Sequence, residues 1–333
     1  TAQALIQTGA VVDKTDADVE YALNENGPYS TVFPEGTNAG KYTVWYRVVE
    51  TGNYTGQPPA RIEVEIGKKQ VSPIITLGGN DLQTDNSTTP PKYFYVYDGT
   101  AKQPTVALTE NDANHTPIPA DQYTVTYHNN KNAGIASVTV ESASGGNYAF
   151  PVQTSLSFEI KKAIAQLTNS PTAKVLEYTG LEQELVTVGA AAGGHVEYAL
   201  DNGSFGPAIP KAINAGRYVV TYKAVGDGSY EDSPTVGSVT VTIKPREVIS
   251  PKITVNGSYT YDGNPQEPGY SDVSVTDGGT TIPGTEYTLS YSNNVNAGTA
   301  TVHVINANGG NYIVNGTADF TIAKAGATVE KAP

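Results

Sequence analysis

Apolar and polar residues alternate in short runs along the whole chain, and these runs recur at similar intervals. Alternation with a period of two places one face of a strand against a core and leaves the other face in water. The runs that close each round of the pattern are Ile62, Val64, Ile66; Leu156, Phe158, Ile160; Val239, Val241, Ile243; and Phe320, Ile322. A second set alternates tyrosine with valine, leucine or threonine, within residues 42–48, 123–127, 218–222 and 287–291. Two such faces packed together predict β-sandwiches.

Three short motifs recur in the same order between these strands. The first is a turn that ends in glycine, at Gln7-Thr8-Gly9, Tyr97-Asp98-Gly99, Tyr178-Thr179-Gly180 and Tyr261-Asp262-Gly263. The second is Asn-Ala-Gly, at residues 38–40, 132–134, 214–216 and 296–298. The third is Gly-Asn-Tyr, or Gly-Ser-Tyr at residues 228–230, and its other copies are residues 52–54, 146–148 and 310–312.

Glycine adopts a positive φ at little steric cost, and a neighbouring Asn or Asp can bond the local backbone. We therefore expect the motifs to form structural turns that set the exit and register of the strands. The predicted turn residues are Gly9, Gly99, Gly180, Gly263, Asn38, Gly40, Asn132, Gly134, Asn214, Gly216, Asn296 and Gly298.

The rounds alternate between two types. Residues 19–23 read Val-Glu-Tyr-Ala-Leu and return as residues 196–200, whereas the second and fourth rounds share an Ile/Val-Ser-Pro opening. The prediction is an all-β chain of tandem immunoglobulin-like sandwiches in an elongated A-B-A-B array. The predicted domains are 1–69 (type A, lacking its opening strand), 70–163 (B), 164–247 (A), 248–325 (B), and 326–333 as the opening segment of a further repeat.

The ends of the chain align with internal segments. Residues 322–333 align without gaps on residues 160–171, and residues 1–5 align on residues 172–176. This alignment predicts a parent chain that continues in both directions. It also predicts an unpaired sheet edge in the first repeat, which allows a head-to-tail self-contact between the C-terminal segment of one molecule and domain 1 of another.

Composition narrows the class of protein. The chain of 333 residues has a net charge of -13 with only 20 Lys and Arg, so the basic surface of a nucleic-acid binder is missing. No stretch approaches the roughly 18 apolar residues of a membrane span, so no membrane insertion is expected in this fragment. Cysteine is absent, which excludes disulfides and cysteine-ligated metals. No cofactor is predicted.

The motifs themselves resemble a known group of repeats. Tyr-Asp-Gly at residues 97–99, followed by Tyr-Thr-Val-Thr-Tyr, Asn-Ala-Gly and Gly-Asn-Tyr, is similar to the MBG/YDG-type bacterial immunoglobulin-like repeats. The type A repeats look like a sister branch, and the first departs from the pattern with Gln7 in place of Tyr. The resemblance implies an extracellular, bacterial cell-surface protein of the adhesin class. It attaches no activity or ligand to the repeat.

Side chains that could carry chemistry are few and scattered. His115, His128, His195 and His303 occupy non-equivalent positions without the spacing of a metal site, so we expect no enzyme and no metal site. Two acidic groups, Asp13, Asp16, Asp18 and Glu110, Asp112, could ligate calcium, but solvated acidic turns are the simpler interpretation. Lysines after the closing strands, such as Lys68, are expected to protect an edge rather than form a crosslink.

Two features offer weak sites for direct binding. Trp45 is a candidate ligand contact, although packing is the simpler interpretation, and residues 80–91 form a polar insertion expected to be exposed and mobile. The predicted function is a non-catalytic stalk, spacer or adhesin segment at a bacterial cell surface. The alternatives are direct binding of an unknown host protein or glycan by the repeats, and an accessory module of an extracellular polysaccharide-active enzyme.

Overall fold

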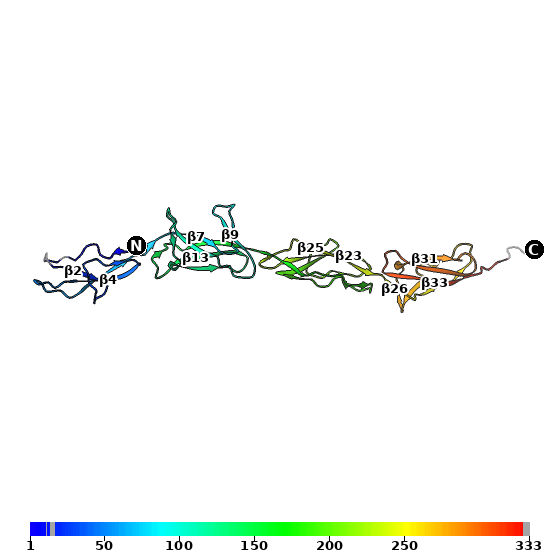
Figure 1. The fold of residues 1–333 in the computed structure, drawn as a ribbon. Helices are drawn as coiled ribbons and strands as arrows, with labels where there is room; N and C mark the ends of the chain where they lie inside the picture. Colours follow the sequence, from blue (N-terminus) through cyan, green and yellow to red (C-terminus); the bar gives the residue numbers. More distant parts are fainter. Residues whose placement is uncertain (11, 14–16, 329–333) are drawn as a thin grey trace, which may run out of the picture. The chain divides into compact units, whose positions relative to one another are not determined.

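The computed structural model describes residues 1–10, 12–13 and 17–328, and it divides into two compact units. Unit 1 spans Thr1–Ala163 and unit 2 spans Ile164–Pro333 (Figure 1). Within the described residues, the regular elements are strands and two single-turn 3₁₀ helices, with no α-helix. The prediction of an all-β chain of tandem immunoglobulin-like sandwiches is confirmed.

Unit 1 contains two sandwiches with separate cores. The first sandwich consists of β1 (Gln3–Ala4), β2 (Val19–Ala22), β3 (Glu35–Gly36), β4 (Gly40–Val48) and β5 (Ala60–Ile66). The second consists of β6 (Lys69–Gln70), β7 (Pro73–Gly78), β8 (Gln83–Asp85), β9 (Lys92–Val96), β10 (Thr105–Glu110), β11 (Pro117–Ile118), η1 (Ala120–Gln122), β12 (Tyr123–His128), β13 (Gly134–Ser142), β14 (Tyr148–Ala149) and β15 (Thr154–Lys161).

Unit 2 repeats this plan after β16 (Ala163–Ile164), which lies at the boundary. The third sandwich consists of β17 (Gln166–Asn169), β18 (Leu176–Glu177), β19 (Gln183–Glu184), β20 (Ala190–Ala192), β21 (Gly194–Leu200), β22 (Lys211–Ala212), β23 (Gly216–Gly226), β24 (Tyr230–Glu231) and β25 (Val236–Lys244). The fourth consists of β26 (Arg246–Val248), β27 (Lys252–Val255), β28 (Tyr259–Thr260), β29 (Val273–Asp277), β30 (Thr280–Thr281), η2 (Gly284–Glu286), β31 (Tyr287–Ser292), β32 (Gly298–Asn306) and β33 (Tyr312–Ala323).

A large antiparallel sheet forms one layer of each sandwich, and each of the last three adds a parallel strand beside its closing strand. The orders are β2-β4-β5, β12-β13-β15-β9-β8, β18-β25-β23-β21 and β31-β32-β33-β26 with β28 also on β33. The parallel pairs are β9 with β15, β18 with β25, and β28 with β33. In the first sandwich, β5 pairs only with β4 among the described strands.

The alternating pattern buries the residues that it predicts. Val138, Val220 and Val302 have no exposed surface and lie at the centres of the second, third and fourth cores, where they contact side chains of the closing strands. The first core is smaller, because only Leu5, Tyr21 and Val44 are buried in it. The sandwiches thus bury valine and isoleucine on one strand face, as period-two patterning requires.

Six of the eight predicted turn glycines have the expected positive φ, and Gly9 and Gly216 do not. Gly99, Gly180 and Gly263 have φ values of 86°, 80° and 86°. The Asp98 and Asp262 side chains each accept a hydrogen bond from the main-chain N–H two residues later, at 2.9 Å. Gly9 lies outside the positive-φ region, and a Cβ there would sit 2.7 Å from the Tyr21 hydroxyl oxygen. The positive φ expected at Gly9 is wrong; close approach of Tyr21 requires this glycine.

The alignment of the first repeat is corrected by these contacts. Leu5 N–H donates to the Pro34 carbonyl at 2.9 Å, as Leu185 N–H donates to the Pro210 carbonyl at 3.0 Å. The Tyr21 hydroxyl accepts from Ala10 N–H as the Tyr198 hydroxyl accepts from Gly189 N–H, each at 2.8 Å. Residues 3–5 therefore correspond to residues 183–185 and not to 174–176. The alignment of residues 1–5 on 172–176 was misleading because the residues before Gly9 and before Gly180 are similar in composition.

The insertion at residues 80–91 is partly a strand. β8 pairs antiparallel with β9 and covers the outer edge of the sheet, and Leu82 packs on the second core. Residues 83–85 are thus a strand and not the loop that the sequence predicts, because Gln83–Asp85 offers three consecutive residues that can pair with the edge of β9.

Truncation of a core leucine tests this packing. Leu185 has no exposed surface, whereas Leu181, four residues earlier, is 72 % exposed. We expect Leu185→Ala to lower the free energy of opening of the third sandwich by about 2–5 kcal/mol, since it leaves a cavity. Hydrogen exchange of the β23 amides measures this opening free energy. Leu181→Ala is the matched control, and an equal effect of both substitutions would contradict the assigned core.

Candidate functional site

The Gly-Asn-Tyr loop of the second sandwich contacts the Asn-Ala-Gly turn of the first. The Asn147 side-chain oxygen accepts a hydrogen bond from Ala39 N–H at 2.7 Å. Its side-chain N–H donates to the Asn38 side-chain oxygen at 3.2 Å. One amide side chain thus satisfies both a donor and an acceptor of the neighbouring turn. We call this set of contacts the asparagine latch.

Unit 2 contains the same latch between its own two sandwiches. The Asn311 side-chain oxygen accepts from Ala215 N–H at 2.7 Å, and its side-chain N–H lies 3.5 Å from the Asn214 side-chain oxygen. The partners are separated by 108 residues in unit 1 and 96 residues in unit 2. Two of the recurring motifs therefore meet in space at the same kind of junction, twice.

The connection between the paired sandwiches is itself hydrogen-bonded. In unit 1, Lys69 N–H donates to the Asn147 carbonyl at 2.8 Å, and β6 pairs in parallel with β14. In unit 2, Arg246 N–H donates to the Asn311 carbonyl at 2.9 Å, and β26 pairs in parallel with β33. The connecting residues are therefore part of the following sandwich, and no flexible linker separates the pair.

A polar side chain under the latch loop orients each asparagine. Gln122 accepts a hydrogen bond from Asn147 N–H at 2.6 Å. Glu286, at the corresponding place in the fourth sandwich, accepts from Asn311 N–H and, at 3.0 Å, from the Asn311 side-chain N–H. Glu286 is nearly buried, so its carboxylate is largely committed to this loop. Gln122 thus holds the main chain of the latch loop in unit 1, whereas Glu286 holds both the main chain and the side-chain amide in unit 2.

An ion pair flanks each latch. Lys69 Nζ lies 2.6 Å from the Glu110 carboxylate, which also accepts a hydrogen bond from the Tyr148 hydroxyl at 3.3 Å. The hydrogen bond to Glu110 raises the pKa of Lys69, so the ammonium stays charged further into the alkaline range than a free lysine does. Arg246 and Asp277 form the equivalent pair in unit 2.

Lys68 adds a further clamp in unit 1. Its ammonium donates to the Ala143 carbonyl at 2.9 Å and to the Ser144 carbonyl at 2.8 Å. These contacts hold the lysine at the junction and not beside the Asn and carboxylic acid that a crosslink needs. Pro245 occupies the corresponding position in unit 2, so this clamp is specific to unit 1.

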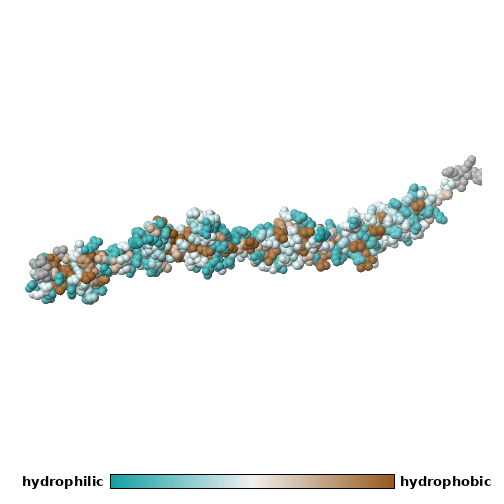
Figure 2. Space-filling model, turned by 45° about the horizontal axis from the view of Figure 1, so that its top comes forward, coloured by the Kyte–Doolittle hydropathy of each residue, from teal (hydrophilic) through white to brown (hydrophobic). Residues whose placement is uncertain are grey.

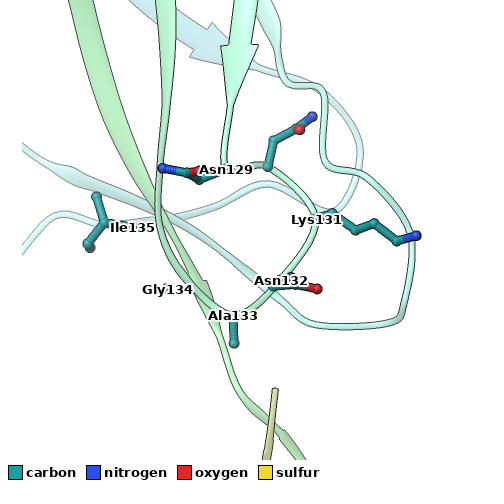
Figure 3. A pocket seen from close by; sticks show the side chains of 7 residues that line it. Asn129, Lys131, Asn132, Ala133, Gly134 and Ile135 are labelled. Atoms are coloured by element: carbon teal, nitrogen blue, oxygen red, sulfur yellow. The ribbon is translucent and has the colours of Figure 1, made fainter. Parts of the chain in front are cut away.

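The other two Asn-Ala-Gly turns lie at residues 132–134 and 296–298. Residues 129–135 curve around a hollow of about 440 Å³ (Figure 3). The side chains of Asn129, Lys131 and Asn132 point in different directions around this loop and do not converge on the hollow. Asn296 makes no latch contact within the described part of the chain. The hollow therefore lacks the convergent polar groups of a small-molecule site.

Trp45 lies half-buried on β4. The guanidinium carbon of Arg61, on the neighbouring strand β5, lies 5.8 Å from the centroid of the Trp45 ring. Arginine over the face of a tryptophan is a favourable packing contact. One face of the Trp45 ring is thus in contact with Arg61.

A larger groove follows the insertion in the second sandwich. Its hollow of about 680 Å³ is bounded by residues 88–93, by Ile135, and by the outer face of β15 with Ser155, Ser157 and Glu159. Figure 2 shows that apolar side chains on the visible face form small patches separated by polar surface. The groove combines apolar and hydroxyl side chains.

Both acidic residues of the second group considered as calcium ligands have partners in the protein. Glu110 bonds Lys69, and the Asp112 carboxylate accepts from Thr116 N–H at 3.0 Å and from the Thr116 hydroxyl at 2.9 Å. Asp16 lies outside the described residues. In the part of the chain that the structure describes, no group of three or more His, Asp or Glu side chains could hold a metal ion.

One histidine has a nucleophile beside it that the sequence did not reveal. His303 Nε2 lies 2.9 Å from the Ser292 hydroxyl, because β31 and β32 place the two residues on neighbouring strands. No carboxylate bonds the other ring nitrogen of His303 within residues 17–328. Without an acid to orient the ring, the pair is a cross-strand hydrogen bond and lacks the third member of a triad.

Comparisons with known proteins identify no relative by sequence. No protein-family model matches the chain, and no curated protein matches it. The chain is similar to Drosophila N-cadherin EC1-4, with 12 % identity, a TM-score of 0.26, and coverage of 95 % of this chain and 94 % of that chain. It is also similar to protocadherin gammaB7 EC3-6 in a cis-dimer structure, with 14 % identity, a TM-score of 0.25, and coverage of 92 % and 93 %. Likeness at these scores carries no functional argument.

No helix of the described chain is long and apolar enough to cross a membrane.

Replacement of the latch asparagine in unit 1 should remove the acceptor of one main-chain N–H, that of Ala39. We expect Asn147→Ala to speed hydrogen exchange of Ala39 N–H by roughly five- to tenfold, the change for a lost hydrogen bond worth about 1–1.5 kcal/mol. NMR-detected exchange measures this rate. Ala215 N–H, held by Asn311 in unit 2, is the internal control and should not change. Unchanged exchange at Ala39 would show that the latch does not form in solution.

Proposed function

We propose that the chain is a non-catalytic repeat segment of an extracellular bacterial surface protein, in which latched pairs of sandwiches form a stalk or spacer. The proposed domains are 1–69, 70–163, 164–247 and 248–325, with types A and B alternating. One A-B pair is the repeating mechanical unit, and its role is to hold a functional head of the parent protein at a fixed distance from the cell.

The observation that carries this proposal is the recurrence of the latch. Asn147 and Asn311 bond their partner turns at the same distance of 2.7 Å, in two units whose other side chains differ. Gln122 is replaced by Glu286, and Lys68 by Pro245, yet the asparagine contact is the same. A spacer keeps a defined geometry when each pair of its sandwiches is joined by the same contacts.

Each contact at the junction contributes little to the free energy of docking between the two sandwiches, but the contacts together contribute more. A hydrogen bond contributes about 0.5–1.5 kcal/mol net, and each junction combines two side-chain bonds, a short parallel strand and an ion pair. The sandwiches are covalently joined by a few residues, so no translational entropy opposes docking. These contacts favour the docked state over an open one.

Sequence character supports the extracellular and bacterial part of the proposal. The Tyr-Asp-Gly, Asn-Ala-Gly and Gly-Asn-Tyr motifs resemble those of MBG/YDG-type surface repeats, and cysteine and methionine are both absent. Adhesion is a second role of the same segment. Its partner is an unknown protein or glycan, and the groove beside residues 88–93 favours this role more than Trp45 does, because it is concave and carries hydroxyl groups.

Distance measurements between spin labels test the rigid pair. The chain has no native cysteine, so labels at Val32→Cys and Val152→Cys are unique, and both positions are 72 % exposed on the two sandwiches of unit 1. We expect a single narrow distance distribution by double electron–electron resonance. Asn147→Ala should broaden it, because undocked states gain population when the latch is removed.

The matched control for this experiment is Asn53→Ala. Asn53 occupies the same motif position in the first sandwich, is exposed, and is far along the chain from the junction of unit 1. It should leave the distribution narrow. A distribution that is already broad in the unmodified chain would contradict the spacer proposal.

A further inference from the structure

The latch loop of unit 2 contains an Asn-Gly dipeptide that the latch loop of unit 1 lacks. Residues 306–312 of the fourth sandwich align without gaps on residues 142–148 of the second. This alignment places Asn308-Gly309 opposite Ser144-Gly145. The two loops therefore occupy the same place in the fold but differ in the chemistry of one side chain.

The turn that contains Asn308 is exposed and closed by a single main-chain bond. Asn308 and Gly309 are both exposed, and Gly309 has a φ of 76°. The closing bond runs from Gly310 N–H to the Ala307 carbonyl at 3.3 Å. Within residues 17–328, no acceptor bonds the N–H of Gly309. The turn can thus open locally without breaking a strand.

An exposed Asn-Gly turn with a free glycine N–H is open to deamidation. The Gly309 nitrogen loses its proton and attacks the side-chain carbonyl carbon of Asn308, which closes a five-membered imide ring and releases ammonia. Water then opens the ring at either carbonyl and yields aspartate or isoaspartate. Ring closure is favoured because both groups belong to adjacent residues and glycine has no Cβ to hinder the approach. Isoaspartate carries the main chain through the former side chain, so the chain gains one C–C bond of about 1.5 Å.

Four further Asn-Gly dipeptides in the same chain provide a comparison. They are Asn26-Gly27, Asn202-Gly203, Asn256-Gly257 and Asn315-Gly316. The N–H groups of Gly27 and Gly203 each donate to the carbonyl three residues earlier, at 3.0 Å and 2.8 Å. Gly316 lies in β33 and pairs with Val304. These three sites are held by hydrogen bonds or a strand ladder, whereas Asn256-Gly257 follows β27 and makes no latch contact.

The turn at Asn308 packs on the residue that supports the latch asparagine. Ala307 N–H donates to the Glu286 carbonyl at 2.8 Å, and the Glu286 carboxylate accepts from Asn311. A Cβ on Gly310 would lie 2.8 Å from the same carboxylate, so the loop fits closely against it. A longer main chain between Ala307 and Asn311 shifts the asparagine relative to Glu286. The new carboxylate also adds a negative charge to a loop that packs on Glu286.

We propose that Asn308-Gly309 is a deamidation site that loosens the latch of unit 2 with time, whereas the latch of unit 1 is free of this change. Ser144, at the corresponding position of unit 1, has no side-chain amide from which the ring could form. This inference rests on the proposed role of the latch as a rigid joint. It makes unit 2 the pair of sandwiches that gains flexibility first as the protein ages.

Peptide mapping by mass spectrometry tests the site itself. The full chain is held in mildly alkaline buffer, where the glycine nitrogen loses its proton more readily, and is sampled over time. We expect Asn308 to convert to aspartate and isoaspartate faster than Asn26, Asn202 and Asn315, by roughly fivefold or more, the factor for one hydrogen bond that must first break. Conversion of Asn308 no faster than that of Asn315, in β33, overturns the proposal.

Hydrogen exchange of the Ala215 N–H, which the latch holds in unit 2, tests the consequence. In the aged chain this exchange should be roughly five- to tenfold faster than in the fresh chain, as for a lost hydrogen bond. The Ala39 N–H of unit 1 is the internal control in the same sample and should not change. The variant Asn308→Ser gives the loop the residue that unit 1 has, and its Ala215 N–H should stay protected after the same ageing.

The two measurements separate the possible failures. Conversion at Asn308 with unchanged exchange at Ala215 would overturn the proposed effect on the latch. An Ala215 N–H that exchanges freely in the fresh chain would contradict the latch and the rigid joint, and mass spectrometry would still decide whether Asn308 is the modified residue.

Discussion

The main-chain N–H of the alanine in an Asn-Ala-Gly turn needs an acceptor when another sandwich packs on it. A buried donor without a partner costs about 1–3 kcal/mol, so the sandwich that buries this N–H must also supply an acceptor for it. The latch asparagine meets this need at Ala39 and at Ala215 with the same geometry. The strand formed by the connecting residues and an ion pair lie at the same junction.

This constraint gives two recurring motifs a role between sandwiches in addition to the turns that they form within their own. The turn presents a donor and an acceptor at one end of a type A sandwich, and the loop presents the matching amide at the start of type B. Gln122 accepts from the main-chain N–H of the latch asparagine in one unit, and Glu286 accepts from both its main-chain and its side-chain N–H in the other. The sequence around the joint varies while its central hydrogen bond does not, as expected of an interaction that fixes orientation.

Local patterns in the sequence predict the strands, the turns and the alternation of repeat types, because period-two burial and positive φ are properties of neighbouring residues. They do not predict which turn meets which loop, since Asn147 and Ala39 are 108 residues apart. The shift in the first repeat escaped detection because Gly9 resembles a positive-φ turn glycine, whereas its role is to admit Tyr21. The pairing of Ser292 with His303 depends on strand register in the same way.

Residual dipolar couplings of the isotopically labelled chain test the central claim most directly, which is that each A-B pair is one rigid body. The amides of β4 and β13 in unit 1 should fit a single alignment tensor, and those of β23 and β32 in unit 2 should do the same. Couplings that need a separate tensor for each sandwich, with reduced magnitude in one of them, would show independent motion across the latch and contradict the account.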